Sequence, residues 1–299
     1  MSRSRPRRAA GIRRLLRLLS WLPLPVAQGI GVLLGGTLAL FPTSLRRITR
    51  TNLDLCLGDL APAERRRLAR RSLIETGKTA AESGAVWLWP PQRVMPLVRE
   101  TVGEDVMEQA VARGKGVILA TPHLGSWEMS GLHAAVRFGI TSLYRPPRMA
   151  ELDQLIRGAR ERTGARLVPT DAGGIRALYQ ALGRGEVIGI LPDQEPAPGA
   201  GVFAPWFGQP AYTMLLLARL ARKSSAPVIF IYAERLPWGR GFRLHYREAE
   251  EGIADADPQV AATALNRTVE ACVRALPVQY QWSYRRFRHR PEGEPSVYR

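Results

Sequence analysis

The sequence has 299 residues, with 43 Lys and Arg against 26 Asp and Glu, a formal net charge of +17, 45% hydrophobic residues and 23% charged residues. This balance, together with only two cysteines, excludes an acidic disordered tail, a disulfide scaffold and a protein with many membrane spans. The length suits one large α/β domain or two small ones. Residues 1–50 contain ten arginines and no acid, which leaves +7 for the other 249 residues, so the excess charge is concentrated at one end.

The same end contains an apolar segment, residues 21–41, that has no ionisable side chain. Pro23 and Pro25 break a helix at its start, so we expect a continuous apolar helix over residues 26–40. At about 1.5 Å per residue this helix measures roughly 22 Å, which is less than the roughly 30 Å of a hydrocarbon core. The sequence therefore predicts a membrane-anchoring helix within residues 1–45, which either dips into one leaflet or spans the membrane with help from residues 21–25 before it.

A signal peptide has a similar layout, with a basic start and an apolar middle. Here the apolar run ends without a small-x-small cleavage pattern, and Arg46, Arg47 and Arg50 follow at once, so we expect no cleavage. Arginines on both flanks suit an anionic cytoplasmic leaflet, where each basic residue is worth about 1 kcal/mol. The alternative interpretation is a buried hydrophobic helix of a soluble protein.

A further helix is predicted over residues 62–85, because Pro62 suits a first helical position and apolar residues repeat at helical spacing. This helix is crowded with arginine. The cluster is either a solvated face or a surface for an anionic partner, and its members are Arg65, Arg66, Arg67, Arg70 and Arg71.

The two cysteines, Cys56 and Cys272, are far apart and lack a Cys-x-x-Cys spacing. They give no support for a metal site or a thiol-redox site. A reduced, cytosolic catalytic face is the simplest interpretation.

From residue 103 onward, short apolar runs alternate with helical stretches. We expect strands at residues 117–121, 140–144, 166–168, 187–191, 228–232 and 242–247. We expect helices at about residues 126–138, 150–163, 173–183, 213–223 and 258–276. Strands that alternate with helices of this length predict an α/β fold with a mixed, mainly parallel central sheet flanked by helices.

Ligands of such sheets usually bind beyond the carboxyl ends of the strands, and His123 follows the first of these strands. Its unperturbed pKa is nearest neutrality, so it suits the removal of a proton from an alcohol. Glu128 lies in the first turns of the next helix, where a carboxylate is able to fold back, fix the tautomer and stabilise the imidazolium. The alternative is a structural histidine at a helix start, with Glu128 facing the helix dipole.

Asp193 follows the strand at residues 187–191 and is a rival to Glu128 as the group that orients His123. This requires the two strands to be near neighbours; otherwise Asp193 caps the loop that follows. We expect His133 to be an ordinary core or surface residue. His245 and His289 are expected to lie outside any cluster at the strand ends.

The segment His123 to Glu128, HLGSWE, resembles the H-x4-D/E signature of membrane-associated glycerolipid-type acyltransferases, specifically the lipid A late acyltransferase branch (lauroyl and myristoyl transferases). Other segments resemble blocks of that family in the same order. They are RTNLDLC at residues 50–56, Tyr144-Arg145-Pro146 with Arg160 and Gly164, Asp193-Gln194, residues 201–213 and residues 280–291. The resemblance covers roughly residues 20–291, and it makes residues 46–299 the acyltransferase domain.

Two departures from the pattern refine this resemblance. Pro122 precedes His123 and Glu128 ends the motif, where the relatives that acylate lysophosphatidic acid more often have Asn-His and Asp, which favours the lipid A branch. The segment at residues 201–213 contains Pro205-Trp206-Phe207-Gly208, where the family more often has two Phe before Gly, so the chain-length preference stays open.

The resemblance implies acyl transfer from an acyl-carrier protein or coenzyme A thioester to a hydroxyl of a lipid A precursor, with no further cofactor or metal. His123 would be the general base and Glu128 would hold it. No acyl-enzyme is required, because a thioester is already activated. Arg160 is the candidate for the oxyanion or a lipid phosphate, although Arg157 and Arg162 are close by. Asp193, Gln194 and Arg145 are the other candidates for substrate binding or acid chemistry.

The implied acceptor is a membrane glycolipid, so we expect the enzyme at the cytoplasmic face of the inner membrane, bound to anionic lipids. Four arginines near the end of the chain are expected to receive lipid phosphates and the acidic acyl-carrier protein: Arg285, Arg286, Arg288 and Arg290. The acyl chain requires an apolar groove, and the candidates for its lining are Trp127, Met129, Trp206, Phe207, Tyr212 and Met214.

Four alternatives stay open at this point. One is an acyltransferase for another glycolipid or a lysophospholipid, and another is a thioester or lipid hydrolase that uses His123 on water. A basic protein also suggests nucleic-acid binding, but the sequence has no binding motif and no aromatic-interleaved basic patch, so we expect no nucleic acid partner. The residues at the strand ends speak against the fourth, a non-catalytic membrane scaffold.

Overall fold

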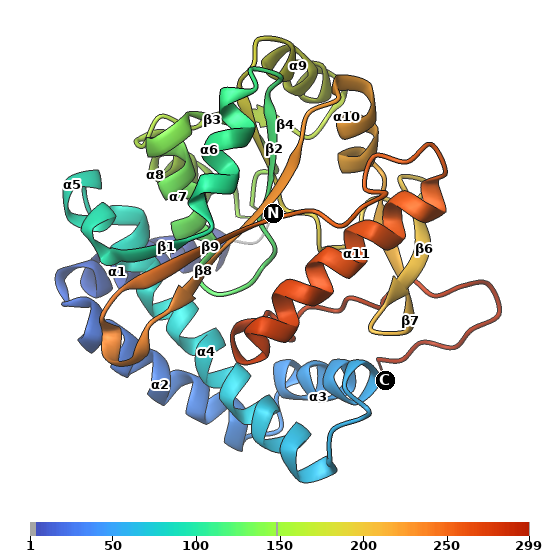
Figure 1. The fold of residues 1–299 in the computed structure, drawn as a ribbon. Helices are drawn as coiled ribbons and strands as arrows, with labels where there is room; N and C mark the ends of the chain where they lie inside the picture. Colours follow the sequence, from blue (N-terminus) through green and yellow to red (C-terminus); the bar gives the residue numbers. More distant parts are fainter. Residues whose placement is uncertain (1–3, 148, 299) are drawn as a thin grey trace.

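The computed structural model describes residues 4–147 and 149–298, so Arg3 of the N-terminal arginine cluster lies outside the described residues (Figure 1). The helices are α1 (Ser4–Trp21), α2 (Leu24–Leu40), α3 (Ser44–Cys56), α4 (Pro62–Leu88), α5 (Pro91–Val94), α6 (Glu104–Ala112), α7 (Trp127–Phe138), α8 (Asp153–Glu161), α9 (Ala172–Gly183), α10 (Leu216–Ser224) and α11 (Pro258–Ala275). The strands are β1 (Val98–Val102), β2 (Val117–Ala120), β3 (Ile140–Tyr144), β4 (Arg166–Pro169), β5 (Val187–Ile190), β6 (Gly201–Trp206), β7 (Gln209–Met214), β8 (Val228–Arg235) and β9 (Phe242–Glu248).

A seven-stranded sheet forms the centre of the molecule, in the order β1-β9-β8-β2-β5-β3-β4 (Figure 1). Only the β8–β9 pair is antiparallel, and the other five pairs are parallel. The strands β2 and β5 are buried along their whole length, because helices cover both faces of the sheet. The prediction of an α/β fold with a mixed, mainly parallel sheet flanked by helices is confirmed.

The segment before α10 differs from the prediction. Residues 201–214 form the antiparallel hairpin β6–β7, and α10 begins at Leu216 and not at residue 213. The turn of this hairpin is formed by Phe207 and Gly208, which both have positive φ (49° and 71°), as a two-residue hairpin turn requires. The segment is rich in Pro and Gly, which is typical of a loop, so the sequence pattern does not indicate this strand pair.

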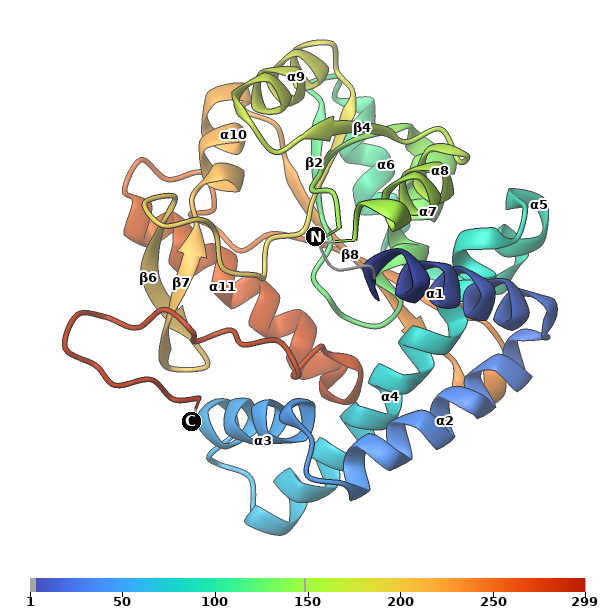
Figure 2. The same cartoon turned by 180° about the vertical axis from the view of Figure 1, so that it is seen from behind.

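The N-terminal helices belong to the same packed body as the sheet. Helix α2 packs along α4 so closely that a Cβ on Gly77 would lie 2.2 Å from the carbonyl oxygen of Gly31. A Cβ on Gly35 would lie 2.3 Å from the Cα of Ile74. Glycine at these three positions therefore permits direct backbone contact between the two helices, and α1 packs beside them on α4 (Figure 2).

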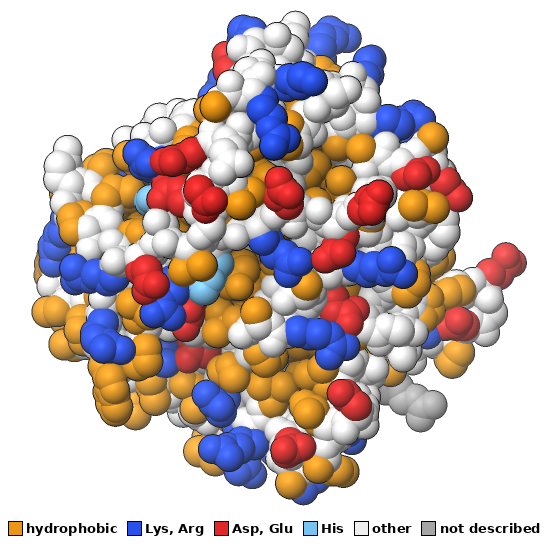
Figure 3. All heavy atoms as spheres, viewed as in Figure 1, with side chains coloured by type: hydrophobic (Ala, Val, Ile, Leu, Met, Phe, Trp, Pro, Cys, Tyr) orange, Lys and Arg blue, Asp and Glu red, His pale blue; other side chains and the backbone are white. Residues whose placement is uncertain are grey.

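The outward faces of α1 and α2 expose apolar side chains. Among the described residues, no single helix is long and apolar enough to cross a membrane; α2 and α3 meet that criterion together, with a bend of 77° between them. Figure 3 shows apolar side chains gathered at the lower left, where α2 lies in Figure 1. The exposed apolar residues of this region, which we call the apolar stripe, are Leu15, Leu18, Trp21, Val26, Val32, Leu33, Leu34, Leu40 and Phe41. The anchoring role of this region and the boundary at residue 45 stay predictions.

Candidate active site

The sheet brings two loops together at one edge. Strands β2 and β5 are parallel neighbours, with Ala120 opposite Ile190, and the Thr121 N–H donates to the Ile190 carbonyl at 2.9 Å. Parallel strands end at the same edge of a sheet, so the residues that follow them meet. The condition on which the Asp193 interpretation depended, that the two strands are near neighbours, is confirmed.

The imidazole of His123 is held by Asp193. Its Nδ1 lies 2.8 Å from Asp193 Oδ1, and the His123 backbone N–H donates to Oδ2 at 2.9 Å. A carboxylate accepts a hydrogen bond, so Nδ1 carries the proton and Nε2 keeps its lone pair. The side-chain nitrogen of Gln194 lies 3.2 Å from Nε2.

The Asp193 carboxyl is 3% exposed. Burial alone would raise its pKa, but the electrostatic attraction of His123 and the hydrogen bonds from its ring and backbone N–H outweigh burial and hold the pKa of Asp193 below its usual range. Asp193 is therefore an anion at neutral pH, the form that fixes the tautomer and stabilises an imidazolium.

Glu128 has a different partner from the one expected. Its two oxygens accept from Nε and Nη2 of Arg160, at 3.1 and 2.5 Å, a bidentate pair that crosses from α7 to α8. Burial raises the pKa of Glu128, but the Arg160 charge and its two hydrogen bonds outweigh burial and lower it overall. The expectation that Glu128 holds the imidazole is thus not met in this structure, because Arg160 occupies its carboxylate. The catalytic role of Glu128 stays a prediction.

The turn that carries His123 is tightly fixed. Gly125 has a φ of +61°, and a Cβ at this position would lie 1.9 Å from the carbonyl oxygen of Ala233. That carbonyl accepts from the Ser126 N–H at 2.8 Å, and the His123 carbonyl accepts from the Gln281 N–H at 3.0 Å. The glycine of the HLGSWE segment is therefore required by the close approach of β8.

Three other arginines near Arg160 in the sequence lie elsewhere. Arg145 is exposed on the loop after β3. Arg157 pairs with Glu161 at 3.2 Å, and Arg162 donates to the carbonyl of Val86 at 2.6 Å. Of the three neighbouring arginines of α8 and its end, Arg160 is the one that reaches the His123 region.

An apolar pocket opens beside the Glu128–Arg160 pair. Trp127 lines it and also packs against His123, with ring centroids 5.1 Å apart. The volume of the cavity is about 60 Å³, and the pocket is partly open to solvent. The lining comes from α7, α8 and the strands β3, β4 and β5, and it includes Gly131, Leu132, Ile140, Leu143, Leu167 and Ile190.

The other residues expected to line an acyl groove lie in the core. Met129 is fully buried. Trp206 packs edge-on against Phe207, at 4.9 Å between ring centroids, and both belong to the core on the other side of the sheet together with Tyr280 and Trp282. Tyr212 is buried and Met214 is partly buried in the same region. Of the six residues expected to line an acyl groove, Trp127 alone is among those that line this pocket.

The C-terminal arginines differ among themselves. Arg286 is 2% exposed and donates to the Tyr212 carbonyl at 2.7 Å, so the expectation that it meets a lipid phosphate or a carrier protein is wrong. It holds the C-terminal segment to β7. Arg285 and Arg288 are exposed, and Arg290 pairs with Glu294.

Sequence reasoning missed the contact of His289 with the strand-end loops. The Glu195 carboxylate is fully buried, and it accepts from the His289 backbone N–H at 3.0 Å and contacts Nδ1 at 2.7 Å. The prediction that His289 lies outside the strand-end region is therefore wrong. A signal was available, since Glu195 stands two residues after Asp193 and an acid at a buried position requires a partner.

Both cysteines are buried, and burial raises the pKa of Cys56 well above its usual range and that of Cys272 to about 12. They are neutral thiols, which suits neither nucleophile nor metal ligand. In residues 4–147 and 149–298, no three His, Cys, Asp or Glu side chains are grouped as a metal site would require. His133 is buried and contacts the Tyr246 hydroxyl at 3.2 Å, as expected for a core residue.

A family model described as bacterial lipid A biosynthesis acyltransferase matches residues 5–289, almost the whole chain. The chain belongs to this family. The resemblance drawn from the HLGSWE segment and its companion blocks is thereby confirmed.

Comparisons with individual proteins also identify lipid A acyltransferases as relatives of this chain. The lipid A biosynthesis lauroyltransferase of Escherichia coli K12 is 30% identical over 285 residues, which cover 95% of this chain and 92% of that protein. The palmitoleoyltransferase of the same organism is 28% identical, with 93% and 90% covered. Its myristoyltransferase is 24% identical, with 86% and 79% covered. The match therefore extends over the whole fold and includes the two strand-end loops.

The lowered pKa of Glu128 predicts an acid-sensitive fold. A carboxyl whose pKa is lower in the folded state than in the unfolded chain stabilises the fold above its unfolded pKa, about 4.3, and this contribution is lost as the pH falls through the lower folded value. We expect the free energy of unfolding, measured with urea, to decline below about pH 4 and to decline less steeply in Glu128→Gln. The exposed Glu248 provides the matched control, Glu248→Gln. An unchanged slope in Glu128→Gln would contradict the assignment.

Proposed function

We propose that this chain is an O-acyltransferase that moves a fatty acyl group from an acyl-carrier protein or coenzyme A thioester to a hydroxyl of a lipid A precursor. Membership of the family and the names of its relatives support the reaction class and the acceptor. The observation that carries the chemistry is the His123–Asp193 pair at the carboxyl edge of the sheet, which leaves Nε2 as a base beside an apolar pocket.

His123 acts as the general base in this proposal. Nε2 takes the proton of the acceptor hydroxyl, and the oxygen attacks the thioester carbonyl. The tetrahedral intermediate collapses with cleavage of the C–S bond, and the imidazolium returns its proton to the departing thiolate. Asp193 stabilises the imidazolium. The ester forms directly from the thioester donor, without an acyl-enzyme and without a further cofactor.

Arg160 is proposed to stabilise negative charge in the same site. It engages Glu128 through Nε and Nη2, a fork geometry that fixes the plane of the guanidinium at the mouth of the pocket. We propose that Nη1 faces the oxyanion of the thioester carbonyl or a phosphate of the glycolipid. Glu128 then acts by holding Arg160 and by adding negative charge near His123, while Gln194 and Arg145 assist substrate binding.

The pocket between α7 and α8 is the proposed site of the acyl chain. Its lining is largely aliphatic, and Trp127 joins it to the imidazole, so a chain seated there would place its thioester carbonyl near Nε2. The sheet residues Gly189 and Ile190 also line the pocket, and we propose that they limit the length of the chain.

We propose that the protein lies at the cytoplasmic face of the inner membrane. The apolar stripe on α1 and α2 would enter the lipid, and the flanking arginines would meet its anionic headgroups. The exposed arginines of α4, which include Arg66, Arg67, Arg70 and Arg71, provide a surface for an acidic acyl-carrier protein.

The direct test is mass spectrometry of the lipid formed from acyl-carrier protein or coenzyme A thioesters and candidate glycolipid acceptors. We expect a new ester on the lipid A precursor, with turnover reduced about 10²- to 10⁴-fold in His123→Ala and unaffected in the control His245→Gln. Near-wild-type turnover in folded His123→Ala would exclude the mechanism. Free fatty acid released equally fast without an acceptor would instead indicate a hydrolase.

The pocket predicts how the acyl preference can be changed. Gly131 lines the pocket, and a Cβ there meets nothing within 4 Å, so Gly131→Leu fills the space without a clash of its Cβ. We expect the preferred acyl chain to shorten, because each CH2 kept out of the pocket costs about 0.8 kcal/mol, or about fourfold in kcat/KM. Gly158→Leu, on the exposed side of α8 with equally open space, is the control. An unchanged chain-length profile in Gly131→Leu would place the acyl chain elsewhere.

A further inference from the structure

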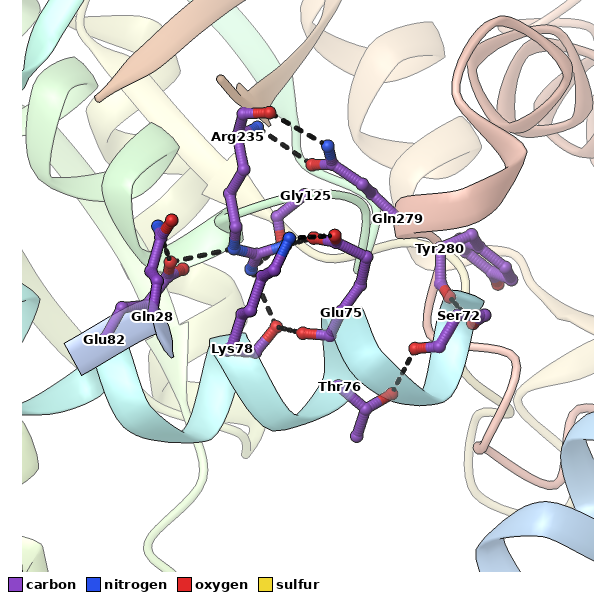
Figure 4. A network of polar contacts seen from close by, with 11 residues as sticks. Gln28, Ser72, Glu75, Thr76, Lys78, Glu82, Gly125, Arg235, Gln279 and Tyr280 are labelled. Atoms are coloured by element: carbon purple, nitrogen blue, oxygen red, sulfur yellow. Dashed lines mark hydrogen bonds and ion pairs between the residues drawn. The ribbon is translucent and has the colours of Figure 1, made fainter. Parts of the chain in front are cut away.

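A buried charged cluster lies against Gly125, two residues after His123 in the chain (Figure 4). Its centre is Arg235, the last residue of β8, which is 4% exposed. The Arg235 Nε donates to Glu82 at 2.8 Å, and Nη1 contacts Glu75 at 3.4 Å; both acids belong to α4. Lys78, one turn along, pairs with Glu75 at 2.6 Å. The four charges balance one another inside the fold.

Arg235 reaches the His123 turn through its guanidinium. The Nη2 donates to the carbonyl oxygen of Gly125 at 2.8 Å and to the hydroxyl of Thr79 at 2.7 Å. The backbone of Arg235 exchanges two hydrogen bonds with the side chain of Gln279, at 2.8 and 3.1 Å, and the Gln279 carbonyl accepts from the Gly125 N–H at 3.0 Å. Both backbone polar groups of Gly125 are therefore held by this one cluster.

The cluster also reaches the N-terminal helices. The side-chain nitrogen of Gln28, on the buried face of α2, donates at 2.9 Å to the same Glu82 oxygen that accepts from Arg235. Gln28 and Glu82 are 4% and 2% exposed. The opposite face of α2 carries part of the apolar stripe, so Arg235 stands between the helix pair α2–α4 and the turn.

Stability alone is a poor reason for such a cluster. A buried ion pair gains little over apolar residues of the same volume, because desolvation offsets most of the attraction. A planar guanidinium with donors in a fixed fork, by contrast, sets the distance between two elements accurately. Here the guanidinium of Arg235 joins α4 to the carbonyl of Gly125, two residues after His123. A displacement of a catalytic group by about 1 Å costs about 10²-fold in rate.

We infer that Arg235 is a positioning residue for the reaction: it fixes the Gly125 carbonyl on the α2–α4 pair and thereby sets where His123 Nε2 meets the acceptor hydroxyl. The inference rests on the proposed role of His123. Arg235 touches neither reacting group, so its loss changes the rate of the chemical step and leaves substrate binding intact.

The first test compares two arginines on neighbouring strands. Arg235→Lys keeps the charge beside Glu82 but removes the fork that reaches Gly125. We expect kcat per folded molecule to fall about 10- to 100-fold, with KM for thioester and lipid unchanged. Arg243 of β9 also bridges two acids, Glu100 at 2.6 Å and Glu234 at 3.3 Å, and lies apart from the turn, so Arg243→Lys should keep wild-type kcat.

A second variant decides the matter if Arg235→Lys fails to fold. Thr79→Val is nearly isosteric and removes only the hydroxyl that shares Nη2 with Gly125. We expect a severalfold fall in kcat at unchanged KM, with circular dichroism and thermal unfolding reporting the folded fraction. A positioning role is overturned if Thr79→Val and any folded Arg235→Lys keep wild-type kcat, or if KM rises while kcat is unchanged. An inactive wild-type enzyme would count against the proposed function instead.

Discussion

The parallel pairing of β2 with β5 is the constraint on which the site depends. It ends two buried strands at the same level, so that His123 and Asp193, 70 residues apart in the sequence, come within a 2.8 Å hydrogen bond. The geometry then determines the chemistry available to the ring. A carboxylate on Nδ1 fixes the proton there, Nε2 lies 3.2 Å from the side-chain nitrogen of Gln194, and the ring packs against Trp127, which lines the apolar pocket.

The helices that carry the apolar stripe support this edge from below. Glycines let α2 and α4 touch through their backbones, and α4 then supplies the acids that hold Arg235 under the His123 turn. The apolar stripe and the edge of the sheet that holds His123 therefore belong to one packed body. Helix α2 thus exposes apolar side chains on one face and contacts the buried charged cluster through Gln28 on the other.

The sequence predicts those parts of the fold and site that depend on local pattern. Buried apolar runs identify β2, β5 and β8, and Pro122 and Gly125 mark the turn that places His123 at the edge of the sheet. The partner of each charged group depends instead on the tertiary fold. Glu128 is five residues from His123, yet Arg160 arrives from α8 and takes its carboxylate.

The partners of Arg286, His289 and Arg235 also depend on the tertiary fold. Arg286 and His289 lie in a C-terminal segment without regular pattern, and their burial follows from contacts with β7 and with Glu195. Arg235 is the last residue of the apolar strand β8, and a charged residue at this position predicts only the end of the strand. Its role follows from the acids of α4, which no local spacing connects to it.

The tautomer of His123 tests the central claim most directly. Nitrogen NMR of the protein labelled with ¹⁵N-histidine distinguishes a protonated Nδ1 from a protonated Nε2, and a His123 variant assigns the signal among the four histidines. We predict a protonated Nδ1 and an unprotonated Nε2 above the pH at which the ring loses its charge, and loss of this preference in Asp193→Asn. A protonated Nε2 in the wild-type protein, or a tautomer indifferent to Asp193→Asn, would contradict the account.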